Sequence, residues 1–268
     1  MSASSSAPTA LEDYSHVKDS LAAIQARVTA HSAAPATRLV AVSKTKPAAA
    51  ILAAYNAGHR HFGENYVQEL VQKSSELPRD ISWHFIGKLQ GNKCKALAAI
   101  PNLWAVETID SEKRARQMDD ALQASRSVES ATPLSSQLNV FIQVNTSGEE
   151  SKGGVGDLSS DSVCQLARFI HTECSHLKLR GLMTIGAPDS DQEYSTDGVH
   201  NPDFVALVKL RKDVAKSLDL ESEHDLELSM GMSGDFEHAL DLGATNVRVG
   251  SSIFGARNYN NNNNNNSK

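Results

Sequence analysis

The sequence contains no run of apolar residues that approaches the ~18 needed to span a bilayer. It also lacks an excess of basic residues, since 26 Lys and Arg stand against 32 Asp and Glu and give a formal net charge of −6. A chain of this charge does not present the positive surface that binds nucleic acids or anionic membranes. We therefore expect neither as a partner, and any anion must be bound by a local pocket.

Cysteine is scarce. Cys94, Cys164 and Cys174 are widely separated, odd in number and outside any Cys-x-x-Cys arrangement. This usage predicts reduced thiols rather than a disulfide framework or a zinc site. The first ten residues also lack the cationic and apolar segments of a secretory signal. We expect a cytoplasmic protein, and the Ser-rich N-terminus leaves a mitochondrial pool open.

Two terminal segments have too few apolar residues to join a core. Residues 1–10 are rich in Ser and Ala, and residues 258–268 contain an unbroken run of Asn. Such segments are expected to be disordered. The polar stretches Ser125–Gln137 and Ala187–Asn201 are predicted to be surface insertions. The remaining residues, 11–257, are expected to form a single domain.

Short apolar runs alternate with helical segments through this domain. Eight runs are predicted to be strands: Arg38–Ser43, His61–Asn65, Ile81–Ile86, Leu103–Glu107, Asn139–Val144, Leu179–Ile185, Leu226–Ser229 and Asn246–Gly250. Seven helical segments separate them: Ala48–Asn56, Val67–Glu76, Asn92–Ala99, Ser111–Ala124, Val163–Thr172, Asp203–Ser217 and Phe236–Leu242. An extra helix over Leu11–Thr29 precedes the first strand. This alternation predicts an α/β fold, a (β/α)8 TIM barrel with an extra N-terminal helix.

An open doubly wound sheet also alternates strands and helices and is the alternative fold. It typically has a Gly-rich turn after its first strand. The corresponding turn here, Ser43–Pro47, contains no glycine. The sequence therefore favours the barrel.

The ends of the last two predicted strands are rich in glycine and hydroxyl groups. Ser-Met-Gly-Met-Ser-Gly-Asp covers residues 229–235, and Arg-Val-Gly-Ser-Ser covers residues 248–252. Either segment alone fits an ordinary turn. In a (β/α)8 barrel, however, the loops after strands 7 and 8 commonly bind phosphate through backbone N–H groups and hydroxyls. Together the two segments predict a phosphate site.

Lys44 directly follows the first predicted strand. A lysine at such a position is usually a surface residue or an ion-pair partner. At a barrel mouth its amine would face the phosphate site, where the charge of Lys46 or partial desolvation would favour the neutral, nucleophilic amine. An aldehyde cofactor that carries a phosphate fits this arrangement, and a lysine-dependent class I aldolase fits it equally well at this point.

Other candidate groups have simpler interpretations. His59 and His61 have the alternate spacing of one strand face, but two histidines do not make a metal site. The pair Glu149–Glu150 is interpreted as a solvated loop. Trp83 and Trp104 are expected to pack between the barrel and its helices. No metal site is predicted.

Several motifs, in order along residues 38–257, resemble the pyridoxal phosphate homeostasis protein family. They are Val42-Ser-Lys44, Phe62-Gly-Glu-Asn-Tyr-Val-Gln68, Trp83-His-Phe-Ile-Gly87, Gly181-Leu-Met-Thr-Ile185, Leu228-Ser-Met-Gly-Met-Ser233 and Val247-Arg-Val-Gly250. The resemblance implies a fold like the N-terminal barrel of alanine racemase. It also implies that pyridoxal 5'-phosphate is bound as a Schiff base on Lys44.

The resemblance further implies which residues surround the cofactor. The phosphate would be held by Ser229, Ser233, Gly250 and Ser251. The pocket would be completed by Asn65, His84, Met183 and Met230.

Arg248 matches the position that faces the pyridine nitrogen in racemase-like barrels. A permanently charged guanidinium there keeps this nitrogen unprotonated and weakens the cofactor as an electron sink. The chain also shows no counterpart of the racemase C-terminal domain, which supplies a catalytic Tyr. The resemblance therefore implies a role in intracellular pyridoxal phosphate (vitamin B6) and amino-acid homeostasis without catalytic turnover. It also implies a monomer, with pyridoxal phosphate-dependent apoenzymes as transient partners. A weak pyridoxal phosphate-dependent amino-acid racemase is the alternative.

Overall fold

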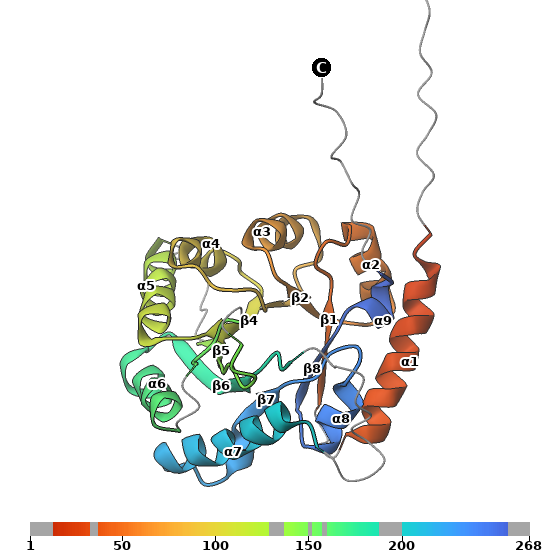
Figure 1. Ribbon diagram of the computed structural model, residues 1–268. Helices are drawn as coiled ribbons and strands as arrows, with labels where there is room; N and C mark the ends of the chain where they lie inside the picture. The colour runs from red at the N-terminus through yellow and green to blue at the C-terminus, as the bar shows by residue number, and fades with distance from the viewer. Residues whose placement is uncertain are drawn as a thin grey trace, which may run out of the picture.

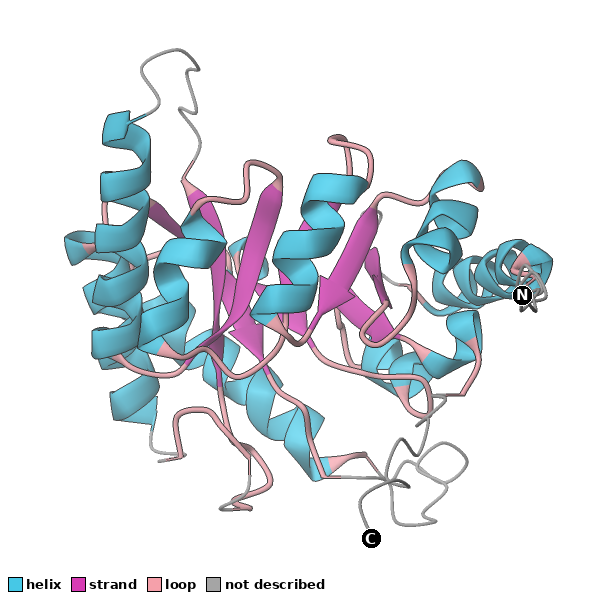
Figure 2. Ribbon diagram, turned by 90° about the horizontal axis from the view of Figure 1, so that it is seen from above, coloured by secondary structure: helices cyan, strands magenta, loops and turns pink. Residues whose placement is uncertain are grey.

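The computed structural model describes residues 13–32, 37–128, 137–149, 152–156, 160–187 and 200–256 (Figures 1 and 2). The two terminal segments and much of the two predicted insertions lie outside these ranges. The described strands form one closed barrel in the order β1 to β8, surrounded by helices.

Every neighbouring pair of strands in the barrel is parallel. The strands are β1 (Arg38–Val42), β2 (His61–Glu64), β3 (Ser82–Phe85), β4 (Leu103–Ile109), β5 (Leu138–Gln143), β6 (Leu177–Met183), β7 (Glu227–Ser229) and β8 (Asn246–Val249). Because β1 pairs with both β2 and β8, the sheet is closed. The prediction of a (β/α)8 barrel is confirmed, and the open sheet is excluded.

The helices lie outside the ring of strands (Figure 1). They are α1 (Ser15–His31), α2 (Ala48–Asn56), α3 (Val67–Glu76), α4 (Cys94–Ala98), α5 (Glu112–Val128), α6 (Ser160–Glu173), α7 (Pro202–Ser217), α8 (Phe236–Asp241) and α9 (Ser251–Phe254). Two short 3₁₀ helices, η1 (Gly91–Lys93) and η2 (Glu223–Asp225), complete the described elements. No described helix is both long enough and apolar enough to cross a membrane.

Helix α1 is the extra N-terminal helix predicted from the sequence. Its buried residues Val17, Leu21, Ile24 and Val28 recur every three or four positions and form one apolar face. That face packs against α2, α8 and α9, which places the helix beside the junction of the first and last strands (Figure 1). The helix therefore covers the point at which the barrel closes.

Most predicted boundaries agree with the structure to within two residues, and α2 and α3 have the predicted ends. Among the strands, β4 continues two residues past Glu107 to Ile109, and β6 begins and ends two residues earlier than predicted. Helix α9 was not predicted, since its four residues, Ser251–Phe254, carry no periodic pattern.

The apolar core lies mainly between the sheet and the surrounding helices. Inside the barrel, a small separate cluster is formed by Ala105, Phe141 and Met183. Polar side chains fill much of the remaining interior; the fully buried ones include His84, Glu107, Ser229 and Asn246. The interior is thus unusual for a barrel of this type, in which branched apolar residues dominate.

Candidate functional site

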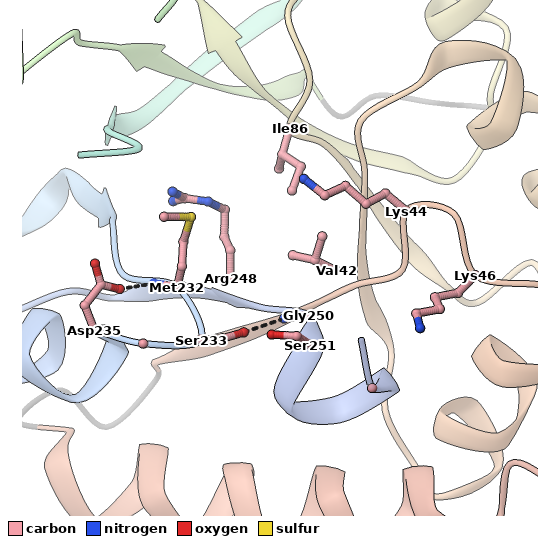
Figure 3. Close-up of a pocket in the computed structure, with 12 residues that line it drawn as sticks. Val42, Lys44, Lys46, Ile86, Met232, Ser233, Asp235, Arg248, Gly250 and Ser251 are labelled. Atoms are coloured by element: carbon pink, nitrogen blue, oxygen red, sulfur yellow. Dashed lines mark hydrogen bonds between the residues drawn. The ribbon is translucent and has the colours of Figure 1, made fainter. Parts of the chain in front are cut away.

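A cavity of about 350 Å³ opens at the carboxyl ends of β1, β7 and β8. Its volume is at the lower end of the range for small-molecule sites. The lining residues are Val42, Lys44, Lys46, Ile86, Met232, Ser233, Gly234, Asp235, Arg248, Gly250, Ser251 and Gly255 (Figure 3). The end of the barrel at which functional residues were expected is therefore the end that carries the cavity.

Lys44 enters the cavity from the turn that follows β1. Its side chain extends past Ile86 toward the side of the cavity where Arg248 lies (Figure 3). Lys46, two residues later, points in a different direction, and its amine donates to the carbonyl of Ala256 at 2.7 Å. The two amines of this turn consequently have different surroundings.

Arg248 forms the opposite wall of the cavity and is only 4 % exposed. Its guanidinium donates to the hydroxyl of Ser229 at 2.6 Å and to the carbonyl of Thr184 at 2.7 Å. Burial lowers the pKa of Arg248, although the charge of Glu107 opposes this shift. The guanidinium nevertheless remains charged, because its ordinary pKa lies far above neutrality. Its two bonds fix the orientation of that charge.

The turns after β7 and β8 form a third wall, rich in hydrogen-bond donors. The Ser233 hydroxyl accepts from the N–H of Gly250 at 3.2 Å and joins the two turns. Within the described part of the chain, the backbone N–H groups of Ser233, Gly234, Ser251 and Ser252, which belong to these turns, have no acceptor in the protein. Groups of this kind can bind an anion without any net positive charge.

Two glycines let these turns approach the rest of the barrel closely. At Gly250 a Cβ atom would lie 3.2 Å from the carbonyl oxygen of Val42. Gly231 has φ +91°, and a Cβ there would lie 2.6 Å from the Cβ of Ala239. Any larger residue would push the turn after β7 or β8 away from its neighbours.

The Asp235 carboxylate also lines the cavity. It accepts a hydrogen bond from the N–H of Met232 (Figure 3). This bond closes the turn after β7 and uses one carboxylate oxygen of Asp235, which is the only acidic residue among the described residues that line the cavity.

A buried polar network lies behind Arg248, inside the barrel. The Glu107 carboxylate accepts from Ser229 at 2.6 Å and from Asn246 at 3.2 Å, and it lies 2.5 Å from Nδ1 of His84. Nε2 of His84 lies 3.0 Å from Nδ1 of His61. Hydrogen bonds therefore run without interruption from Arg248 through Ser229, Glu107 and His84 to His61.

The charges in this network follow from burial and partners. Burial by itself would raise the pKa of Glu107, but the hydrogen bond from His84 and the charge of Arg248 hold that pKa below its usual value. Burial lowers the pKa of His84 in spite of its bond to Glu107. An ionised Glu107 only accepts, so a neutral His84 donates from Nδ1 and accepts at Nε2. Glu107 is then the counter-ion of Arg248.

Five of the ten site residues expected from the sequence line the cavity: Lys44, Ser233, Arg248, Gly250 and Ser251. The structure brings these five together from three separate strand ends.

The other five expected residues do not line the cavity. Ser229 and His84 are fully buried in the network described above. Met183 lies inside the barrel with Phe141, and Met230 belongs to the core outside it. Asn65 follows β2, and its buried Oδ1 has no hydrogen-bond partner in the described part of the chain.

Two important residues were not singled out from the sequence. Met232 lies within the 229–235 motif but is apolar, so the search for hydroxyls and glycines passed over it. Glu107 carried a usable signal, because it is a charged residue in the otherwise apolar run Leu103–Glu107. A buried carboxylate of this kind is seldom found without a partner.

The fold belongs to one known class of barrel. The sequence profile of the family described as "Alanine racemase, N-terminal domain" matches residues 18–258. Alanine racemase from Bartonella henselae has the same fold, with a TM-score of 0.64 at 16% identity, covering 91% of this chain and 60% of that one.

Closer relatives define the family. The pyridoxal phosphate homeostasis protein of Schizosaccharomyces pombe is 48% identical over 219 residues, which are 82% of this chain and 84% of the relative. The human protein of the same name is 46% identical over 227 residues, 83% of this chain and 77% of the relative. PipY of Synechococcus elongatus, solved with pyridoxal phosphate bound, gives a TM-score of 0.67 at 31% identity and covers 89% of this chain and 100% of its own. The chain belongs to the pyridoxal phosphate homeostasis protein family.

Proposed function

We propose that this protein binds pyridoxal 5'-phosphate as a Schiff base on Lys44 and takes part in intracellular pyridoxal phosphate and amino-acid homeostasis without turning over amino acids. The observation that carries the proposal is the meeting of Lys44, Arg248 and the turns after β7 and β8 around one cavity. The names of the relatives and the ligand bound to PipY support two parts of this proposal, the binding of pyridoxal phosphate and the role in its homeostasis.

The donor groups of the cavity fit the cofactor's phosphate. The acceptor-free N–H groups of the lining residues Ser233, Gly234 and Ser251, together with the Ser233 and Ser251 hydroxyls, would provide bonds for a dianion. A phosphate held there leaves the side of the cavity between Lys44 and Arg248 for the ring. The amine of Lys44 would then be the group that attaches the aldehyde.

Arg248 accounts for the proposed absence of turnover. The cofactor supplies an electron sink through its pyridine ring, and the depth of that sink depends on protonation of the ring nitrogen. A guanidinium that faced this nitrogen would donate a hydrogen bond to it without giving up its proton. Ser229 and Thr184 hold the guanidinium in place, so Arg248 would keep a bound cofactor weakly reactive.

Three wider expectations from the sequence remain predictions: a monomer, a cytoplasmic location and transient contact with pyridoxal phosphate-dependent apoenzymes. An open cavity is compatible with such transfer, since the carboxyl end of the barrel is where the cofactor would enter and leave.

Borohydride reduction of the protein with pyridoxal phosphate, followed by peptide mapping, tests the proposal. We expect one phosphopyridoxyl group, attached to Lys44, and none on that peptide in Lys44→Ala. Lys46→Ala is the matched control, because it removes the neighbouring amine and should leave the adduct at Lys44. An adduct spread over other lysines, or no adduct, would refute the attachment site. Exchange of an amino acid's α-proton in heavy water would instead favour the racemase alternative.

A further inference from the structure

The turn that carries Lys44 has a strained backbone. Thr45 has φ +63°, which lies in the left-handed region. This conformation is uncommon for any residue with a side chain and is a genuine outlier for a β-branched one. Such strain persists only where the surroundings impose it.

Helix α3 holds this turn on both sides of Lys44. On one side, the ammonium of Lys73 donates to the carbonyl of Ser43 at 2.8 Å. On the other, the carboxylate of Glu69 accepts from the N–H of Thr45 at 2.7 Å. The same Glu69 oxygen accepts from Lys73 at 2.6 Å, so the two contacts are part of one ion pair.

The Lys73 ammonium of this ion pair is also bound to a second, buried carboxylate. Lys73 is only 5 % exposed and also donates to Glu64 at 2.7 Å. Glu64 is fully buried and accepts from the Ser43 hydroxyl at 2.6 Å. Removing an ammonium and carboxylates from water is unfavourable unless hydrogen bonds replace the lost hydration, so this cluster is a specific arrangement. Its contacts converge on the residues immediately before and after Lys44.

We propose that Glu69, held by Lys73, is a positioning residue that keeps Thr45 in its left-handed conformation and so directs the Lys44 side chain into the cavity. Neither Glu69 nor Lys73 lines the cavity itself. The effect therefore reaches the cofactor only through the backbone of the turn. The inference rests on the proposed function, since it concerns attachment of an aldehyde to Lys44.

Two ligands separate positioning from general damage to the site. Pyridoxal 5'-phosphate tests Schiff-base formation, followed by visible absorbance and by borohydride trapping at Lys44. Pyridoxine 5'-phosphate has the same ring and phosphate but no aldehyde, so its affinity reports the cavity without the amine. Glu76→Ala is the matched control, because Glu76 is an exposed acid on the same helix and its carboxylate accepts a hydrogen bond from Gln72 rather than from the turn.

For Glu69→Ala we expect the equilibrium constant of Schiff-base formation to fall about tenfold, the factor that corresponds to one lost charge-assisted hydrogen bond. Pyridoxine 5'-phosphate affinity should stay within about twofold of the parent. Adding Thr45→Gly to Glu69→Ala should restore most of the loss, because glycine adopts this φ without support. Glu69→Gln retains an acceptor for the Thr45 N–H and should lose less than Glu69→Ala.

Hydrogen exchange of the cofactor-free protein gives an independent readout. In Glu69→Ala the amides of Thr45 and Lys46 should exchange faster than in Glu76→Ala. Equal Schiff-base formation in Glu69→Ala and Glu76→Ala would overturn the inference while leaving the proposed function intact. A parallel fall in the affinity of both ligands would also overturn it. If the parent protein forms no Schiff base at Lys44, the proposed function fails, and the inference fails with it.

Discussion

Replacing Glu107 by glutamine removes the negative charge at the centre of the barrel and keeps the size of the side chain. In the parent, the carboxylate accepts from His84, Ser229 and Asn246 and balances the charge of Arg248. A glutamine has one acceptor oxygen, so at least one of these buried donors loses its partner, at a cost of about 1–3 kcal/mol. Arg248 is also left without its buried counter-ion.

Breaking a buried ion pair by changing one partner typically destabilises a protein by about 3–5 kcal/mol. Glu107 and Arg248 interact through Ser229 rather than directly. We therefore expect a destabilisation at the lower end of this range, about 3 kcal/mol. For a domain of this size that corresponds to a fall in Tm of about 6–12 °C.

Urea unfolding at pH 7, followed by circular dichroism, measures the difference in unfolding free energy. Glu112→Gln is the control, since it removes an exposed charge in the first turn of α5 and should change stability by less than about 0.5 kcal/mol. If Glu107→Gln is as stable as this control, then Glu107 is not the ionised centre of the network.

Two further predictions concern stability. Burial lowers the pKa of His59 to about 4 and that of His61 to about 3, so below pH 6.5 the unfolded chain binds protons that the folded chain does not. Stability should therefore fall as the pH drops from 6.5 toward 4, although Glu64, whose pKa burial raises to about 7, acts in the opposite direction. Urea unfolding at several pH values measures how the free energy of unfolding depends on pH. In His59→Phe this dependence should be weaker than in the parent by about 1.4 kcal/mol per pH unit. An unchanged slope would contradict a buried neutral His59. Thermal unfolding of two glycine variants tests the effect of crowding. Gly231→Ala should lower the free energy of unfolding by more than about 2 kcal/mol and Gly243→Ala by about 1 kcal/mol, because both glycines have φ near +90° but only Gly231 has neighbours within 4 Å of the added carbon. Equal losses of stability in the two variants would mean that crowding has no role.

The barrel could be predicted because its signal is local and repeated. Each buried strand is a short apolar run such as Arg38–Val42, and each of the first seven is followed by a segment that could be recognised as helical. The exact strand ends could not be predicted, because they depend on the hydrogen bonds of the neighbouring strand. The extension of β4 to Ile109 is an example, since Ile109 pairs with Ile142 of β5.

Part of the candidate site could be predicted for a similar reason. The positions of Lys44 and Arg248 follow from the rule that strand ends of a barrel meet at one face. The direction in which a side chain points is harder to predict, because it depends on partners far away in the sequence. Ser229 stands in a motif that predicts phosphate binding, yet its hydroxyl bonds to Glu107, 122 residues earlier. Nothing in the local sequence indicates that choice.

The polar interior of the barrel has a consequence for how such a sequence can diverge. Exchanging a whole buried ionic group for apolar residues can be neutral, whereas losing one member leaves its partner charged and unsatisfied. Glu107, Ser229 and Arg248 come from β4, β7 and β8. Any single substitution among them should therefore lower the stability of the fold. Descendants of this chain would have to alter these distant positions in concert, and intermediate genotypes would pass through poorly folded forms. The three positions should accordingly vary as a group or not at all.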